Sequence, residues 1–525
     1  MVPLVRRLDR RSGWVATFAV TALAGFLRLW GLGKPEEFLF DETYYAKDAW
    51  SLLKHGYTTG YVEDANERIL GGDLTGLFLD SPSMIVHPEV GKWLIALGEQ
   101  AFGMDPFGWR VSAAVAGTLT VLVMVRLVRR LTGSTLLGAT AGLLLAFDGL
   151  HFVMSRLALL DIFVSLFLLA AVSCLVADRD WSRARLASLV PAGWVPTADD
   201  WGPVRGLWFR PWRLAAGVLL GLAVATKWNA LFPLMVFGLL VWAWDGGARR
   251  SLGIRRPWLR AALVDAVPAF VHLVVVALVV YVVSWTGWLM HAGEYEQSLS
   301  DTQYGAYWGT YLEKDAEGFL PETAQSLRSL WNYHQDVYTF HTRGLTGAEH
   351  TYASDAAGWL LLNRPVGVAA DLNIAPGMQG CDAPQDSTCL RQVLLLGTPV
   401  LWWGGVLALG YALFAWVARR DWRYGVAVLG VASTWLPWLR YDDRPVFSYY
   451  AVSTIPFTVI AATLLLGTLL GGPSTSYTRR MLGAVLGGTF VVLVVVNFAW
   501  FWPIYTHDLL TTPEWLERIW FRAWI

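Results

Sequence analysis

Two adjacent carboxylates, Asp41 and Glu42, stand in an apolar and aromatic stretch near the start of the chain. Residues 38–45 read Phe-Leu-Phe-Asp-Glu-Thr-Tyr-Tyr. Burial raises the pKa of a carboxyl group and a nearby cation lowers it, so a carboxylate in such surroundings can be tuned to take a proton from a hydroxyl group. We therefore interpret the pair as a candidate general base. The competing interpretation is a pair of loop carboxylates that face water.

Three cations from distant parts of the chain are candidates for an anion site. Arg110 begins the second long apolar segment, Lys227 ends the fifth, and Arg444 lies between the ninth and the tenth. If they converge, they supply the positive charge that a phosphate or diphosphate lipid head group needs. A carboxylate beside such a site suits glycosyl transfer from a lipid phosphate, because the cations stabilise the leaving phosphate and the carboxylate activates the acceptor oxygen.

Four further residues are candidates for supporting roles. His87 and Lys92 introduce an amphipathic stretch, and the alternative for them is a helix cap with a snorkelling lysine. Arg156 and Asp161 lie at the ends of the third and fourth apolar segments, where ionisable groups are functional-site candidates. The alternative is that Arg156 and Asp161 pair with each other and hold two helix ends together.

A metal site is not predicted, because no cluster of histidines or carboxylates has metal-ligand spacing. Arginine and lysine side chains can instead supply the positive charge that stabilises a phosphate. We expect no cofactor beyond a lipid-linked sugar donor as co-substrate.

The composition is that of a membrane protein, and the chain is expected to be all-α. Of the 525 residues 55% are hydrophobic and 16% are charged, against about 25% charged in a soluble domain. The formal net charge of zero gives no indication of nucleic-acid binding.

Eleven apolar segments approach the roughly 20 residues needed to cross a bilayer, near 14–32, 109–128, 134–153, 158–177, 212–226, 229–244, 262–289, 393–417, 424–439, 449–471 and 482–502. The break at residues 227–229 could instead lie within one bent helix, which would make ten.

The distribution of arginine favours eleven segments. Arginine clusters alternate from one connection to the next as expected for a cytoplasmic N-terminus and an extracytoplasmic C-terminus. Residues 33–108 and 290–392 are then two large extracytoplasmic loops of a single polytopic membrane domain. Each loop contains an amphipathic stretch, at 90–102 and at 327–338, which suits a helix lying in the interface. Cys381 and Cys389 bracket a polar stretch of the second loop, where an oxidising compartment makes a disulfide as plausible as two free thiols.

These motifs together resemble the protein O-mannosyltransferase (PMT) family of the GT-C glycosyltransferase superfamily, in an actinobacterial form. The ordered set runs along nearly the whole chain. It comprises the pair at 41–42, His-Pro-x-x-Gly-Lys at 87–92, Arg-x-Ser-Ala at 110–113, residues 156–161, residues 221–232, Leu-Leu-Gly-x-Pro-x-x-Trp-Trp at 395–403, Leu-Pro-Trp at 436–438, and Arg-x-x-Phe at 444–447.

The resemblance implies a polyprenyl-phosphate-mannose donor, Ser or Thr hydroxyls of exported proteins as acceptors, and inversion to an α-mannosyl product in the cell membrane. Under it, Asp41 looks like the catalytic base with Glu42 supporting it. Arg110, Lys227 and Arg444 look like contacts of the donor phosphate. Residues 448–450, Ser-Tyr-Tyr, depart from eukaryotic members, which tend to be His-rich there.

Eukaryotic members carry a β-trefoil MIR domain in the second large loop, and the hundred or so residues here leave no room for one. Acceptor selection is therefore expected to differ. Several polar and aromatic residues of the loop follow the family's flanking pattern and could shape an acceptor groove or merely pack an interfacial helix: His334, His341, His350, Tyr352, Ser354 and Trp359.

Two other functions compete with this prediction. Another GT-C enzyme, moving a different polyprenyl-phosphate-linked sugar to a lipid or cell-wall glycan, would share the carboxylate and the cations. A transporter is disfavoured, because the unusual charges gather at the outer face instead of the bilayer centre. The predicted outer site also suggests that acceptors arrive from the secretion translocon.

Overall fold

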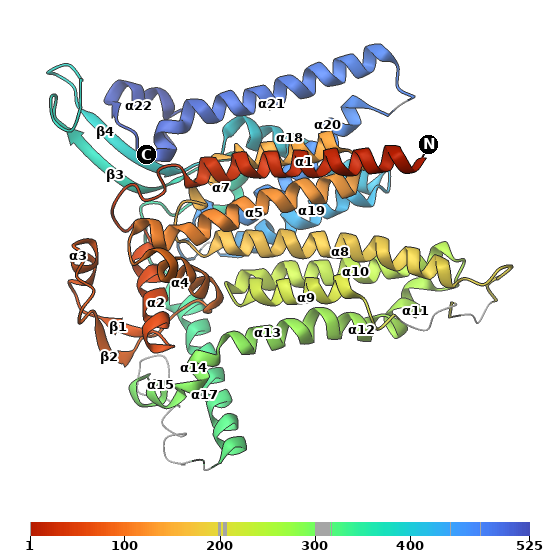
Figure 1. Cartoon of the computed structure of the whole chain (residues 1–525), viewed down its shortest axis with the longest axis horizontal. Helices are drawn as coiled ribbons and strands as arrows, with labels where there is room; N and C mark the ends of the chain where they lie inside the picture. The colour runs from red at the N-terminus through yellow and green to blue at the C-terminus, as the bar shows by residue number, and fades with distance from the viewer. Residues whose placement is uncertain are drawn as a thin grey trace.

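The protein is a helical bundle with smaller elements gathered at one end, which we call the loop end (Figure 1). The computed structural model describes residues 2–197, 201–202, 207–299, 316, 318–441, 443–472 and 474–525, with side chains described from residue 11 onward. The bundle contains a helix for each predicted apolar segment: α1 (Val2–Leu29), α5 (Pro106–Thr132), α6 (Thr135–Ala146), α8 (Asp161–Leu189), α9 (Pro211–Val224), α10 (Leu231–Ser251), the run from α11 (Pro257–Val264) through α12 (Ala266–Phe270) to α13 (Val276–Ser284), α18 (Pro399–Val417), α19 (Trp422–Trp435), α20 (Ile455–Leu470) and α21 (Tyr477–Thr506).

The helices fit a multi-pass membrane protein. Seven of those in the described ranges are long and apolar enough to cross a membrane, and the shorter helices α6, α9 and α20 are also apolar. The N-terminus lies at the end of the bundle away from the loops, and the C-terminus lies at the loop end (Figure 1). An odd number of crossings produces this arrangement, although the count of eleven stays a prediction.

The break near Lys227 separates two helices, as the sequence predicted. α9 ends at Val224, a single 3₁₀ turn, η1 (Trp228–Ala230), follows Lys227, and α10 begins at Leu231. The extended backbone of Lys227, with φ −158° and ψ 134°, prevents one continuous helix. The turn lies at the loop end (Figure 1).

The opposite end of the same helices is held by a buried network of ion pairs. Arg213 on α9 bonds Asp245 on α10 at 2.6 Å, and Arg210 reaches Asp245 at 2.9 Å and also Asp178 on α8. Each carboxylate is shared between two guanidinium groups. The network fixes α8, α9 and α10 relative to one another and thereby the turn at their far end.

The first large loop folds as a small helical layer against the bundle. Its elements are α2 (Glu42–His55), β1 (Thr59–Tyr61), α3 (Ala65–Leu70), β2 (Phe78–Pro82) and α4 (Val90–Phe102). β1 and β2 pair in an antiparallel ribbon. The predicted amphipathic stretch at 90–102 forms α4, which confirms the helix, whereas its position in the membrane interface stays a prediction.

The second large loop contains both helices and strands. Its described elements are α14 (Thr286–Met290), α15 (Ala292–Leu299), α17 (Phe319–Thr339), η3 (Phe340–Gly344), η4 (Ala356–Leu361), β3 (Val366–Ile374) and β4 (Cys389–Leu395). α17 includes the predicted amphipathic stretch at 327–338. The strands were not predicted, because Gly, Asp and Asn interrupt the alternation of apolar residues along β3.

Strands β3, β4 and β5 (Leu510–Thr511) form one antiparallel sheet in that order, and α22 (Thr512–Arg518) follows β5. β3 is therefore an edge strand. Cys381 and Cys389 form a disulfide across the hairpin between β3 and β4, which decides the question that the sequence left open.

Helix α4 packs tightly against the segments that carry two predicted site residues. A Cβ atom on Gly91 would lie 2.7 Å from Leu160 and 3.0 Å from Thr226. The N–H of Val90 donates to the carbonyl of Ala225 at 3.0 Å. Glycine at position 91 thus lets α4 sit directly beside the residues that precede Asp161 and Lys227.

Candidate active site

Asp41 is the N-cap residue of α2, and its side chain is half-buried. The hydroxyl of Tyr45, one helical turn further on, donates to its Oδ2 over 3.5 Å. Burial is the main reason that the pKa of the Asp41 carboxyl is raised to about 6, with Asp161 also raising it and Lys227 and the Tyr45 hydrogen bond opposing the shift. A carboxyl tuned in this way suits a general base near neutral pH.

Glu42 is directed away from Asp41 into a separate buried ion pair. The Arg110 guanidinium donates to Glu42 Oε1 at 2.9 Å and to Oε2 at 2.8 Å, and both side chains are fully buried. The backbone N–H groups of Leu39 and Ala158 donate to the same carboxylate, each at 2.9 Å. Glu42 therefore joins the first loop to the start of α8.

Arg110 is occupied by this pair and by backbone carbonyls. It is placed by α5, which begins with an Asp105 cap that accepts from the Gly108 N–H at 2.8 Å. Its remaining N–H groups donate to the carbonyls of Leu32, Pro35 and Glu37. In the described structure its guanidinium holds the loop that carries Asp41, and its predicted contact with the donor phosphate stays a prediction.

Lys227 and Asp161 form the second buried pair. Lys227 Nζ lies 3.0 Å from Oδ1 and 2.8 Å from Oδ2 of Asp161, the first residue of α8. The ammonium group also lies 4.4 Å from the centre of the Tyr450 ring. Both charged side chains act electrostatically on Asp41. The structure thus brings Asp41, Asp161 and Lys227 together from three distant segments.

Arg156 does not pair with Asp161, so that alternative is wrong. Its guanidinium donates instead to the carbonyls of Leu27, Arg28, Trp30 and Gly31, at distances between 2.6 and 3.4 Å. These carbonyls close the end of α1, where the last turn of a helix leaves acceptors without intrahelical donors. Arg156 therefore caps α1 and holds it against α7 (Gly149–Met154).

His87 and Lys92 approach the site from α4 and the turn before it. Lys92 pairs with Asp48 on α2 at 2.9 Å, and the Tyr61 hydroxyl donates to Asp48 at 2.8 Å, so Lys92 is not a lysine that snorkels into water. The His87 ring stacks on His341 with centroids 5.3 Å apart. Burial lowers the pKa of His87 well below its usual value, and Lys227 and other cations lower it further, so the imidazole is neutral.

Arg444 joins this group from the connection between η5 (Leu436–Arg440) and η6 (Ser448–Ser453). Its Nη1 donates to the backbone carbonyl of His341 at 2.6 Å, and its Nε is buried without a hydrogen-bond partner among the described residues. It adds to the positive potential at His87 together with Lys227. Arg444 and Lys227 therefore approach one region, and one N–H of Arg444 remains available to an anion.

Sequence reasoning missed three side chains of the site. Tyr45 contacts Asp41, Tyr450 lies against Lys227, and Asp48 pairs with Lys92. Asp41 and Tyr45 are four residues apart and therefore share one face of a helix, so a helix predicted at this place would have indicated their contact. The contacts of Tyr450 and Asp48 cross between elements, and no local pattern indicates them.

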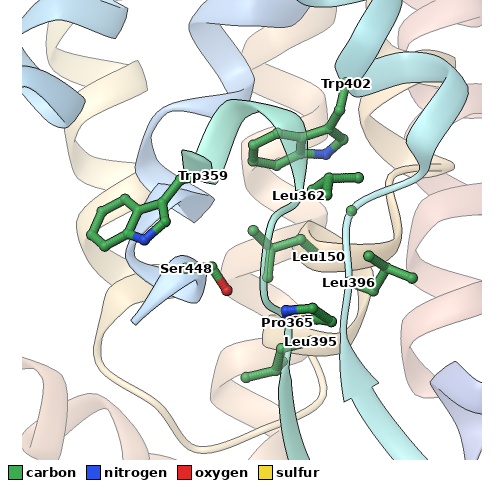
Figure 2. Close-up of a pocket in the computed structure, with 9 residues that line it drawn as sticks. Leu150, Trp359, Leu362, Pro365, Leu395, Leu396, Trp402 and Ser448 are labelled. Carbon is green, nitrogen blue, oxygen red and sulfur yellow. The ribbon is translucent and has the colours of Figure 1, made fainter. Parts of the chain in front are cut away.

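Two small pockets lie near the loop end. The pocket in Figure 2 is lined mainly by apolar side chains, among them Leu150, Trp359 and Trp402, with Ser448 as a polar neighbour. None of the predicted catalytic, phosphate-binding or supporting residues lines it, although Trp359 was one of the residues that could shape an acceptor groove. The other is lined by His87, Trp228 and His334 among others. Within the described parts of the chain, no group of His, Cys, Asp and Glu is arranged to hold a metal ion.

The overall fold matches a solved protein O-mannosyltransferase complex of S. cerevisiae bound to the sugar donor. The TM-score is 0.68 at 14% sequence identity, over 98% of this chain and 93% of that chain. The arrangement of helices and loops is therefore the fold of that complex, and the predicted helical fold class is confirmed.

The sequence identifies the family within that class. Residues 18–195 match the family described as dolichyl-phosphate-mannose-protein mannosyltransferase, and residues 326–524 match the C-terminal four TMM region of protein-O-mannosyltransferase. The chain is 38% identical to a polyprenol-phosphate-mannose–protein mannosyltransferase of Mycolicibacterium smegmatis, over 98% of this chain and 94% of that protein. It is 32% identical to a protein of the same name from Corynebacterium glutamicum, over 99% and 94%. The chain belongs to the protein O-mannosyltransferase family, and the resemblance predicted from its motifs is confirmed.

Proposed function

We propose that this protein transfers mannose from polyprenyl-phosphate-mannose to Ser or Thr hydroxyls of exported proteins, with Asp41 as general base. The observation that carries the proposal is the half-buried Asp41 beside the Lys227–Asp161 pair, in a chain with full-length mannosyltransferase relatives. The active site and the C-terminus face the outside of the cell membrane in this account. Acceptors reach the site as they leave the secretion translocon.

The reaction follows from the charges at the site. Asp41 takes the proton from the acceptor hydroxyl as its oxygen attacks the anomeric carbon of the donor from the face opposite the phosphate. The bond from that carbon to the phosphate oxygen breaks, and Lys227 and Arg444 stabilise the charge of the leaving lipid phosphate. A single displacement inverts the anomeric carbon, so a β-linked donor gives an α-linked product. Asp161 holds Lys227 in place, whereas Glu42 and Arg110 hold the loop before Asp41.

A comparison of donor sugars tests the choice of substrate. Purified protein is supplied with one Ser/Thr peptide and either polyprenyl-phosphate-mannose or an aminoarabinose-type polyprenyl phosphate. We expect glycopeptide only with the mannose donor. Glycopeptide from the arabinose-type donor alone would contradict the proposal and favour another GT-C transferase.

The rate of transfer is expected to depend on pH through Asp41. The base acts only when ionised, and its pKa is raised to about 6, so kcat/KM should fall as the pH drops through about 6 and level off above it. Tyr45→Phe removes a hydrogen bond that stabilises the carboxylate, so its acid limb should move to higher pH. Rates measured in a buffer series check both effects. An acid limb that keeps its position in Tyr45→Phe would contradict the assignment of this limb to Asp41.

A further inference from the structure

A row of aromatic side chains leads from Asp41 out to the surface. Phe40, the residue before the base, is not glycine and yet has a φ of 53°, in the left-handed region. Such a conformation is strained for a residue with a side chain and persists where the surroundings enforce it. The Phe40 ring lies edge-on to Phe447 and Tyr449, both with centroids at 5.8 Å, and to His350 at 6.1 Å.

The row continues through the second large loop. His350 is exposed and stands at 90° to Phe447, with centroids 4.9 Å apart, and Tyr352 follows at 6.1 Å. The Tyr352 N–H donates to His350 Nδ1 at 3.1 Å. Neither Nε2 of His350 nor the Tyr352 hydroxyl has a hydrogen-bond partner among the described residues.

The row ends at strand β3. The Tyr352 hydroxyl would lie 2.6 Å from a Cβ atom on Gly367, so this ring covers the beginning of the strand. β3 pairs with β4 on one side only, and its residues 370–373 are all exposed.

A second aromatic group, formed by Trp228, Tyr281 and His334, differs from this row because its polar atoms bond one another. Trp228 Nε1 donates to the Tyr281 hydroxyl at 2.8 Å, and that hydroxyl donates to His334 Nε2 at 2.6 Å, because His334 Nδ1 donates to the Leu330 carbonyl. These side chains satisfy one another and join α17 to the bundle. The row through Phe40, Phe447, His350 and Tyr352 keeps hydrogen-bonding groups unused at the surface.

We propose that this row, from Phe40 through Phe447 and His350 to Tyr352, binds an extended segment of the acceptor polypeptide and guides it from Asp41 towards the open edge of β3. The inference rests on the proposed function. An acceptor hydroxyl that reaches Asp41 is part of a polypeptide, so the acceptor residues on either side of it must lie on the outward surface of the protein. Aromatic side chains offer large, rigid contact area at low entropic cost, and an open strand edge offers backbone groups to an extended chain.

Kinetics with a long and a short acceptor test the proposal. The long acceptor is a Thr-containing peptide of about ten residues, which spans roughly 33 Å when extended, and the short acceptor is a threonine blocked at both ends. For His350→Ala and Tyr352→Ala we expect KM for the long peptide to rise about tenfold. KM for blocked threonine and the affinity for the donor should stay within about twofold of the wild type, since neither side chain reaches the base. Phe319→Ala, an exposed aromatic at the far end of α17, is the matched control and should change neither KM.

Equal rises of KM for both acceptors, or no rise for the long peptide, would overturn the proposal. Donor affinity within twofold of the wild type shows that a variant is folded, and the exposed His350 provides a test if Tyr352→Ala fails this check. Wild-type protein that transfers mannose to neither acceptor would instead contradict the proposed function, so the two failures are distinguishable.

Discussion

Asp41→Asn is expected to lower kcat for mannosyl transfer by about 10²–10⁴-fold, the usual contribution of a positioned general base. Asparagine has nearly the same shape but cannot take the proton of the acceptor hydroxyl. Because the substitution removes a negative charge that acts on Lys227, the affinity for the lipid phosphate should stay unchanged or increase. Single-turnover transfer to peptide, with donor affinity measured separately, checks both parts.

Asp80→Asn is the matched control for this substitution. Asp80 is an exposed aspartate on β2 in the same loop, so the variant loses the same charge outside the site and should keep wild-type activity. If Asp41→Asn keeps its activity at equal folded yield, the base is another residue. If it loses affinity for the donor as well, Asp41 contributes mainly to donor binding.

Glu42→Gln is expected to destabilise the protein and to reduce transfer together. Removing one partner of a buried ion pair leaves an uncompensated charge and costs about 3–5 kcal/mol. Arg110 would be that charge, because it is fully buried with Glu42 as its only carboxylate partner in the described structure. The loop that carries Asp41 would then shift, and a misplacement of about 1 Å can lower a rate about 10²-fold. Thermal unfolding in detergent and peptide transfer measure the two effects.

Asp180→Asn provides the control for this prediction. Asp180 pairs with Arg130 at 3.3 Å, but both side chains are more than 40% exposed, so breaking that pair should change the melting temperature little. The double variant Glu42→Gln, Arg110→Met removes both charges. If it regains stability but not activity, the Glu42–Arg110 pair serves to position the loop that carries Asp41. Wild-type stability in Glu42→Gln would contradict the account of a buried, paired charge.

Hydropathy and charge predicted the bundle because the membrane imposes length and composition on each segment separately. Each of the eleven apolar segments coincides with a helix, and the polar break at Lys227 separates α9 from α10. The edge strand β3 was missed, because Gly, Asp and Asn interrupt the alternation of apolar residues along it. The capping of the end of α1 could not be predicted either, because the residue that caps it, Arg156, lies more than a hundred residues away in the chain.

The pairing of the candidate charged residues could not be predicted from the sequence. The alternative that joined Arg156 to Asp161 relied on closeness in the chain, whereas Asp161 pairs with Lys227, 66 residues away. Arg110 was predicted to contact the donor phosphate, and the sequence did not indicate that Glu42, 68 residues earlier, pairs with it. Which buried charges meet depends on the packing of helices, and one sequence shows only which charges require a partner.

The measurement that tests the central claim most directly is the product formed by purified wild-type protein. The protein is incubated with β-linked polyprenyl-phosphate-mannose and a Ser/Thr peptide, and the peptide is analysed by mass spectrometry and NMR. The account predicts one mannose joined to a Ser or Thr oxygen in the α configuration. An intact, correctly inserted protein that leaves the peptide unmodified, or that yields a β-linked mannose, would contradict it.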